Sequence, residues 1–118
     1  MENNLLLRRG NICFVNLDPT VGHEQAKKRP CVIISTDLFN NSPAGLIVIL
    51  PLTTKQRNIP WQIKVNPPEG GLKIASYIIC DQIRTISKSR VLSKPLGSLT
   101  NQTLKEIEKR VKILLELY

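Results

Sequence analysis

Most of the chain carries short apolar runs rich in branched side chains, separated by stretches that contain Pro, Gly and Asn. Such runs predict β-strands, and their spacing is typical of a compact antiparallel sheet or barrel. The connections DPTVGHEQAKKRP, TDLFNNSPAG, KQRNIP and NPPEGG contain residues that break regular structure, so we expect loops there. The predicted strands are Asn11 to Leu17, Cys31 to Thr36, Leu46 to Thr53, Trp61 to Val65, and Ser76 to Ile83.

The hydrophobic period changes near the end of the chain and predicts one amphipathic helix. Its N-cap is either Thr100 or Thr103, the latter in a capping box with Glu106. The apolar stripe packs on the barrel in the simplest interpretation, and binds a partner in the alternative one. The stripe consists of Leu104, Ile107, Val111, Leu114, Leu115 and Tyr118.

The length of 118 residues and the 42% hydrophobic content fit a single mainly β domain over residues 1–118. The net charge is +8, from 17 basic and 9 acidic residues. This charge favours a polyanion or an acidic protein segment as partner, although some basic proteins are simply soluble basic proteins.

The N-terminal segment MENNLLLRRG is too short in its apolar part for a secretory signal, and we expect no membrane span. The cysteines Cys13, Cys31 and Cys80 are far apart and lie in apolar runs, which predicts buried reduced thiols in the cytoplasm. With one histidine and no clustered thiols, we expect neither a metal site nor a cofactor.

The connection between the first two predicted strands contains the string GHEQAKKRP, which combines an acid, a base and three cations. A histidine is suited to proton transfer at neutral pH, so His23 and Glu24 are candidates for acid–base chemistry. Arg29 precedes a proline, which favours an extended backbone and makes it the best-positioned cation. Lys27 and Lys28 are expected on a solvated loop, where they would steer phosphates.

The string RRGNICFVNLDPTVGHEQAKKRPCVIIS, residues 8–35, resembles the opening of the MazF/PemK/Kid family of endoribonuclease toxins from type II toxin–antitoxin modules. The resemblance covers essentially the whole chain, because further family motifs follow in order. These are DLFN at 37–40, LPLTT at 50–54, IP at 59–60, CDQIRTI at 80–86, and the amphipathic helix.

The resemblance implies a small SH3-like barrel with a C-terminal helix, assembled as a symmetric homodimer. Family members cleave single-stranded RNA at short recognition sequences without a metal. Their products carry a 2',3'-cyclic phosphate and a 5'-hydroxyl. An acidic, partly disordered antitoxin covers the RNA groove and blocks the enzyme.

By the family motif, Arg29 binds and neutralises the scissile phosphate and the Thr53 hydroxyl bonds a phosphate oxygen. Because a guanidinium stays protonated, Glu24 or His23 is the easier general base. The Kid branch uses the histidine, the aspartate of D-Q and an arginine two residues before that aspartate. His23 and Asp81 match that set, but the arginine position holds Ile79, so these two are site or scaffold residues here.

Other side chains near these motifs are candidates for RNA contact, because cations bind phosphates and amides read base edges. Arg84, in the CDQIRTI motif, would contact RNA or the second subunit. The remaining candidates are Gln25, Lys27, Lys28, Lys55, Gln56 and Arg57.

Two alternatives of other functional classes remain open, because a fold does not fix a function. One is a CcdB-like toxin that binds DNA gyrase and has no nuclease activity. The other is a basic barrel that binds RNA without cleaving it.

Overall fold

A computed structural model describes residues 6–117; Tyr118 and the first residues of the N-terminal segment lie outside this range. The helical segments are α1 (Asp37–Asn40), the 3-10 turns η1 (Glu69–Gly71) and η2 (Lys88–Arg90), and α2 (Asn101–Leu115). The strands are β1 (Asn11–Asn16), β2 (Lys28–Ile33), β3 (Leu46–Thr53), β4 (Gln62–Val65), β5 (Ser76–Ile79), β6 (Arg84–Ser87) and β7 (Gly97–Ser98).

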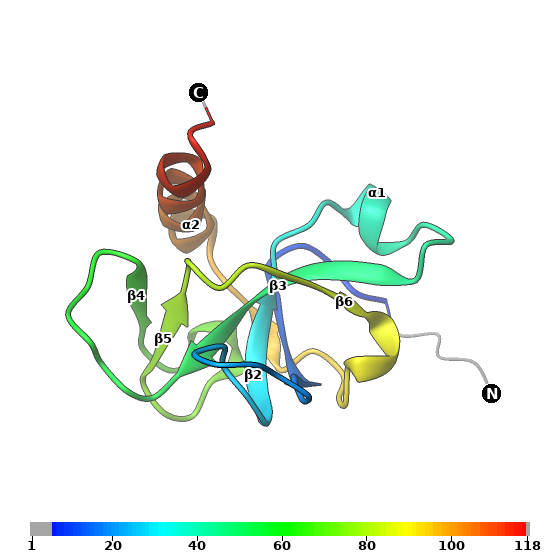
Figure 1. Cartoon of the computed structure of the whole chain (residues 1–118), viewed down its shortest axis with the longest axis horizontal. Helices are drawn as coiled ribbons and strands as arrows, with labels where there is room; N and C mark the ends of the chain where they lie inside the picture. The colour runs from blue at the N-terminus through cyan, green and yellow to red at the C-terminus, as the bar shows by residue number, and fades with distance from the viewer. Residues whose placement is uncertain (1–5, 118) are drawn as a thin grey trace.

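The strands form one curled antiparallel sheet in the order β4-β5-β3-β2-β1-β7, and β6 also pairs with β3. In Figure 1, β3 runs through the centre of the molecule and α2 stands at one end of the sheet. The predicted mainly β fold with a C-terminal helix is therefore confirmed.

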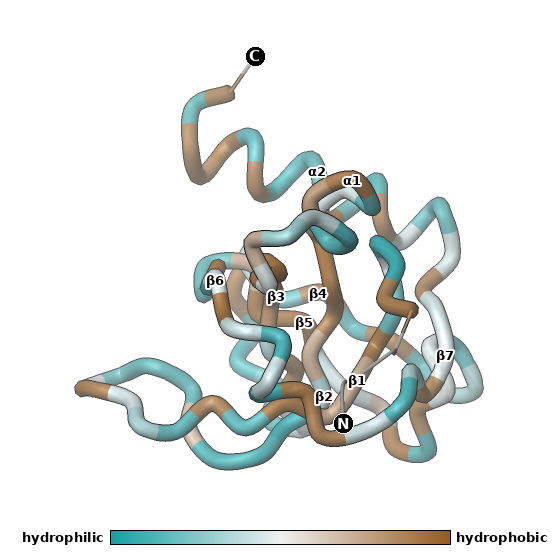
Figure 2. The backbone as a smooth tube through the Cα atoms, turned by 90° about the vertical axis from the view of Figure 1, so that its right-hand side faces the viewer, coloured by the Kyte–Doolittle hydropathy of each residue, from teal (hydrophilic) through white to brown (hydrophobic). Residues whose placement is uncertain are grey.

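Two apolar cores lie on opposite faces of the sheet, because successive strand residues point to opposite sides. Ile12, Val32 and Leu50 belong to the core that also contains Leu104 and Ile107 of α2. The other core takes alternate residues of the same strands. Its members are Leu7, Cys13, Val15, Leu17, Cys31, Ile33, Ile47, Ile49, Ile86 and Val91. Figure 2 shows apolar positions concentrated along the central strands.

Helix α2 begins after Thr100, whose side-chain hydroxyl accepts a hydrogen bond from the Thr103 backbone N–H at 3.2 Å. Of the two predicted caps, the one at Thr100 is therefore confirmed and the one at Thr103 is wrong. Leu104, Ile107 and Val111 of the stripe pack on the sheet as expected, whereas Leu115 in the last turn is exposed. None of the helices within residues 6–117 has the length and apolar composition needed to cross a bilayer.

Strand β2 starts at Lys28, three residues before the predicted start, so Lys28 and Arg29 are strand residues and the prediction of a solvated loop at Lys28 is wrong. Pro30 lies opposite Phe14, whose backbone N–H and C=O bond to Ser93 and Leu92 on the other edge of β1. The missing N–H of proline therefore costs no ladder hydrogen bond at this position. The strand also ends early, since Thr36 caps helix α1, which the sequence pattern did not predict.

The predicted strand from Ser76 to Ile83 is two strands, β5 and β6, separated by residues 80–83. Ile78 lies opposite Leu52 and Ile86 lies opposite Ile47. The nine residues 78–86 thus span six residues of β3, 47–52, and three residues are extra. These extra residues bulge out of the ladder, which is how bulges redirect side chains next to functional sites.

The cysteines are free and buried in the cores. Burial raises the pKa of the Cys13 thiol to about 11 and the pKa of the Cys31 and Cys80 thiols to about 12. These side chains are protonated at neutral pH and act as small apolar groups in the core.

The contact between η1 and β7 requires glycine, because Gly71 has φ +73° and a Cβ there would overlap the Leu96 carbonyl oxygen. We expect Gly71→Ala to lower the free energy of unfolding by about 2–4 kcal/mol, from the left-handed backbone and the displaced strand. Chemical denaturation measures this change. Gly45→Ala is the matched control: its φ is +68° but no atom lies within 4 Å of the added Cβ. It should cost only about 1 kcal/mol, and equal losses in the two variants would contradict the steric argument.

Candidate RNA-cleavage site

The loop between β1 and β2 is closed at its base by hydrogen bonds to backbone groups. Leu17 N–H donates to the Lys27 carbonyl at 2.9 Å, and Lys27 N–H donates to Asp18 Oδ1 at 2.9 Å. Arg90 Nη1 donates to the carbonyls of Asn16 and Asp18 at 3.1 and 2.6 Å. The base of the loop is therefore fixed to the sheet, as is usual for functional loops on a rigid scaffold.

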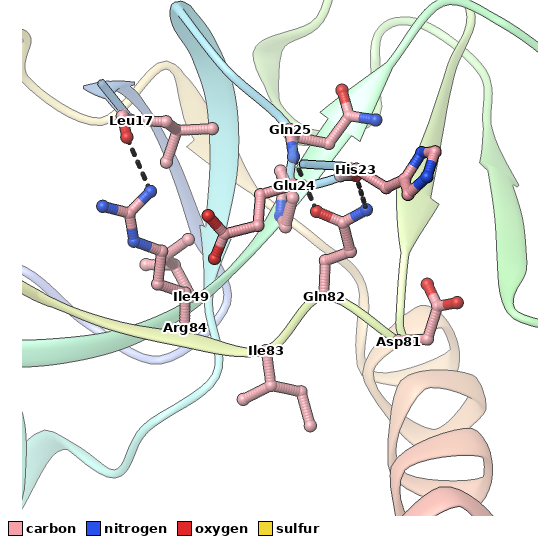
Figure 3. A pocket seen from close by; sticks show the side chains of 10 residues that line it. Leu17, His23, Glu24, Gln25, Ile49, Asp81, Gln82, Ile83 and Arg84 are labelled. Atoms are coloured by element: carbon pink, nitrogen blue, oxygen red, sulfur yellow. Dashed lines mark hydrogen bonds between the residues drawn. The ribbon is translucent and has the colours of Figure 1, made fainter. Parts of the chain in front are cut away.

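Gln82 connects the middle of this loop to the bulge between β5 and β6. Its Oε1 accepts a hydrogen bond from Gln25 N–H at 2.7 Å and its Nε2 donates to the His23 carbonyl at 3.1 Å (Figure 3). Sequence reasoning missed this residue: it stands in the CDQIRTI motif, but nothing in the motif shows that its amide reaches the loop. The bulge and the loop thereby form one structural unit.

A hollow of about 370 Å³ lies between the loop, the bulge and β3. In Figure 3, the Glu24 carboxylate points into this hollow between Arg84 and Gln82. Arg84 Nη1 donates to the Leu17 carbonyl at 2.6 Å, so part of this guanidinium is used to hold the loop. The hollow is lined by Leu17, His23, Glu24, Gln25, Ile49, Pro51, Asp81, Gln82, Ile83 and Arg84.

A second hollow, of about 490 Å³, shares the loop wall with the first and extends toward β4. It brings most of the predicted chemistry together: Arg29 and Arg57 as cations, Glu24 and Asp81 as carboxylates, and His23. Its other lining residues are Gln25, Ala26, Ile59, Gln62, Ile79 and Gln82. The two hollows share five lining residues, and we call them together the loop cleft.

Arg29 lines the loop cleft and also lines a third hollow together with Thr53. Cys31 lies opposite Pro51 in the β2–β3 pair, and continuing that register by two residues places Arg29 opposite Thr53. Directly opposed residues of antiparallel strands have their side chains on the same face. Both residues also line a hollow of about 270 Å³ together with Lys27 and Lys28.

The hydrogen bonds of these two side chains leave their reactive ends free. Arg29 Nε donates to the Ala26 carbonyl at 2.8 Å, which orients the guanidinium and leaves its two terminal amino groups for a ligand. Thr53 Oγ1 accepts from Lys55 N–H at 3.2 Å, so the hydroxyl proton remains available for donation. Both are therefore oriented donors, which is what binding of a phosphate requires.

The acid–base candidates lie on the loop and the bulge. Glu24 Oε1 accepts from Val21 N–H at 2.6 Å, which holds the carboxylate and leaves its second oxygen free. The exposed His23 ring points away from that carboxylate in Figure 3. Within residues 6–117, the side chains of His23 and Asp81 make no hydrogen bond or ion pair, so neither is held by a partner.

The remaining predicted RNA contacts divide between three places. Lys27 and Lys28 are exposed beside Arg29, and Lys55 is exposed next to Thr53. Gln56 lies outside the loop cleft, in a smaller hollow on the other side of the β3–β4 loop.

Ile79, at the position of the Kid-type arginine, is 5% exposed and lines the loop cleft with Arg29. The loop cleft thus has an apolar side chain at the position where the Kid branch carries an arginine. In the part of the chain that the structure describes, no three His, Cys, Asp or Glu side chains gather closely enough to hold a metal ion.

If Gln82 holds the loop, Gln82→Ala should expose the Gln25 amide to solvent. We expect its hydrogen exchange to accelerate by about fivefold to tenfold, the effect of losing one hydrogen bond of typical net strength. NMR exchange at that amide measures it. Gln82→Glu keeps the acceptor oxygen for Gln25 and loses only the donor to His23, so protection should remain. Unchanged exchange in Gln82→Ala would show that the loop is held elsewhere.

Comparison with known proteins assigns the chain to a family. A family model described as "PemK-like, MazF-like toxin of type II toxin-antitoxin system" matches residues 8–115. Endoribonuclease MazF9 of Mycobacterium tuberculosis is 30% identical, over 96% of this chain and 99% of the relative. Endoribonuclease EndoA of Bacillus subtilis is 28% identical, over 96% and 97% of the two chains.

Solved structures of similar fold agree with this assignment. MazF from Deinococcus radiodurans superposes with a TM-score of 0.86 at 21% identity, over 97% of this chain and all of that one. A mycobacterial endoribonuclease in complex with its cognate antitoxin superposes with a TM-score of 0.76 at 25% identity, over 95% and 97% of the two chains. The chain therefore belongs to the family of PemK-like, MazF-like toxins of type II toxin–antitoxin systems.

Proposed function

We propose that this chain is the toxin of a type II toxin–antitoxin pair and acts as a sequence-specific, metal-independent endoribonuclease on single-stranded RNA. The observation that carries the proposal is that Arg29 and Thr53 line one hollow beside a loop that presents a carboxylate. The proposed site of action is the cytoplasm, in keeping with the three free thiols.

The reaction starts from the ribose 2'-hydroxyl, which attacks the adjacent phosphorus once a base removes its proton. The bond to the 5'-oxygen breaks as the new bond to the 2'-oxygen forms, and the leaving oxygen takes a proton. The products are a 2',3'-cyclic phosphate and a 5'-hydroxyl. Because the RNA supplies the nucleophile, DNA, which lacks the 2'-hydroxyl, is not a substrate.

Within this reaction, the terminal amino groups of Arg29 neutralise the charge that develops on the phosphorane oxygens, and the Thr53 hydroxyl donates to one of them. The free carboxylate oxygen of Glu24 is the proposed base, because the carboxylate lines the same cleft as Arg29. Arg29 is also the proposed proton donor to the leaving oxygen. His23 and Asp81 are proposed to support the site from the loop and the bulge.

The net charge of +8 and the cations around the cleft also suit two protein partners. An acidic antitoxin segment would occupy the loop cleft and compete with RNA, since both carry negative charge. A second copy of the chain would complete a symmetric dimer, so that one RNA strand crosses both subunits.

The test is incubation of the purified protein, in excess EDTA, with a long single-stranded RNA and its DNA counterpart. We expect discrete RNA cuts ending in cyclic phosphate, with the DNA intact. Arg29→Ala should lower kcat by about a hundredfold to a thousandfold, as loss of a transition-state donor does, and Thr53→Val by about tenfold. Arg8→Ala, which removes an exposed arginine that lines none of the hollows described above, is the matched control for charge. Intact RNA would instead favour the two non-nuclease alternatives. Binding of DNA gyrase would then favour the CcdB-like toxin, and binding of RNA without cleavage would favour the RNA-binding barrel.

The choice of base has its own test. Glu24→Gln keeps an oxygen for the Val21 N–H but removes the proton acceptor. We expect kcat to fall by about a hundredfold or more while RNA affinity stays within a few-fold. Single-turnover cleavage together with binding of a 2'-deoxy-substituted RNA separates the two effects. A larger loss in His23→Gln than in Glu24→Gln would assign the base to the histidine.

A further inference from the structure

A small polar hollow of about 220 Å³ lies beside the β3–β4 loop, and none of the proposed catalytic residues lines it. This volume equals that of about seven water molecules at roughly 30 Å³ each, so the hollow has room for a small ligand group. Figure 1 shows the long loop that precedes β4 passing beside β4 and β5. The lining residues are Gln56, Asn58, Ile59, Gln62, Lys64 and Tyr77.

The hollow is joined to the proposed catalytic residues by a row of side chains across the sheet. Thr53 lies opposite Tyr77 in the β3–β5 pair, and Tyr77 lies opposite Lys64 in the β4–β5 pair. With Arg29 opposite Thr53, the row runs Arg29, Thr53, Tyr77, Lys64 on one face. Tyr77 is two strands from Arg29, about 10 Å at the usual strand spacing.

The loop that forms one wall of the hollow is fixed by Gln62. Its Nε2 donates to the Lys55 carbonyl at 3.1 Å, and its Oε1 accepts from Arg57 N–H at 2.8 Å. This amide is therefore used to shape the loop. The hollow is accordingly built by a specific contact between a strand and the loop rather than by chance packing of surface side chains.

The other polar groups in the hollow keep donors unused. Tyr77 OH donates to Gln56 Oε1 at 3.4 Å, and Gln56 Nε2 donates to Asn58 Oδ1 at 2.8 Å. The second N–H of Gln56 and both N–H groups of Asn58 Nδ2 have no acceptor among residues 6–117. In the same range, the exposed Lys64 ammonium forms no hydrogen bond or ion pair.

We propose that this hollow is a nucleobase subsite that reads one position of the RNA next to the scissile phosphate. The half-buried Tyr77 ring stacks on the base. Gln56 and Asn58 donate to acceptor atoms on the base edge. Lys64 contacts the following phosphate. The inference rests on the proposed RNA cleavage and adds a residue-level source of its sequence selectivity.

The test compares Tyr77→Val and Tyr77→Phe with the unchanged protein by sequencing the ends of fragments cut from a randomised RNA. Valine suits a strand but cannot stack, whereas phenylalanine keeps the ring. We expect Tyr77→Val to lower kcat/KM on the preferred sequence by about tenfold to a hundredfold and to relax the preference at one position. Tyr77→Phe should stay within about threefold, and thermal unfolding controls for the fold.

A binding arm separates this inference from the proposed function. Fluorescence anisotropy with a 2'-deoxy-substituted copy of the preferred RNA, or with a randomised pool if no cut is found, needs no catalysis. Weaker binding by Tyr77→Val supports the subsite even if the protein fails to cut RNA. Lys64→Ala should weaken binding at low salt more than Lys94→Ala, which removes the same charge outside the hollow. Unchanged cutting preference and unchanged RNA binding in Tyr77→Val would overturn the proposal. It would also be overturned if Tyr77→Val weakened the binding of an acidic peptide but not the binding of RNA.

Discussion

Strand β3 is paired along both of its edges, and the register of those pairs decides which side chains meet. Cys31 lies opposite Pro51 on one edge, and Leu52 lies opposite Ile78 on the other. A shift of β2 by one residue would turn Arg29 toward the core that α2 covers and bring Val32 out of it, since side chains alternate between faces. The apolar cores therefore enforce the same register that brings Arg29 to Thr53.

The sequence predicted best the elements whose side chains are uniformly apolar. The bounds of β3 were predicted correctly, because seven of its eight residues form an uninterrupted apolar or proline-containing run. The start of β2 was missed, because Pro30 was taken to end the loop, whereas it lies at a position where no ladder hydrogen bond is needed. The division between β5 and β6 was missed because the apolar residues Cys80 and Ile83 stand on either side of Asp81 and Gln82 and make the segment resemble one continuous strand. The alternation of apolar residues indicates which face of the sheet a residue lies on. It does not show where a strand ends or changes its pairing register with its neighbour.

The candidate site was predicted in part for a similar reason. The sequence indicated that the first loop concentrates acids, bases and cations, and the family resemblance paired Arg29 with Thr53. Neither could indicate Gln82, whose amide meets Gln25 across 57 residues of chain, or Gln62, which shapes the β3–β4 loop. These amides bind backbone groups of other segments, so their roles depend on the tertiary fold. Sequence motifs name the reactive groups more readily than the groups that hold them in place.

The departure at Ile79 explains where the positive charge of the loop cleft comes from. Ile79 lies opposite Gln62 of β4 and, by the register of β3 with β5, opposite Pro51. Ile79 and Pro51 form an apolar floor, and the isoleucine is 5% exposed. A cation placed there would lose its hydration and need a partner. Instead Arg29 enters from β2 and Arg57 from the β3–β4 loop, and both line the cleft from its rims. An apolar floor lowers the local dielectric, so each rim cation acts more strongly on a bound phosphate than it would in water. In the proposed reaction, electrostatic stabilisation therefore depends on strand β2, which carries Arg29, and on the β3–β4 loop, which the Gln62 amide holds. The Gln82 amide holds the loop that presents the Glu24 carboxylate to the same cleft.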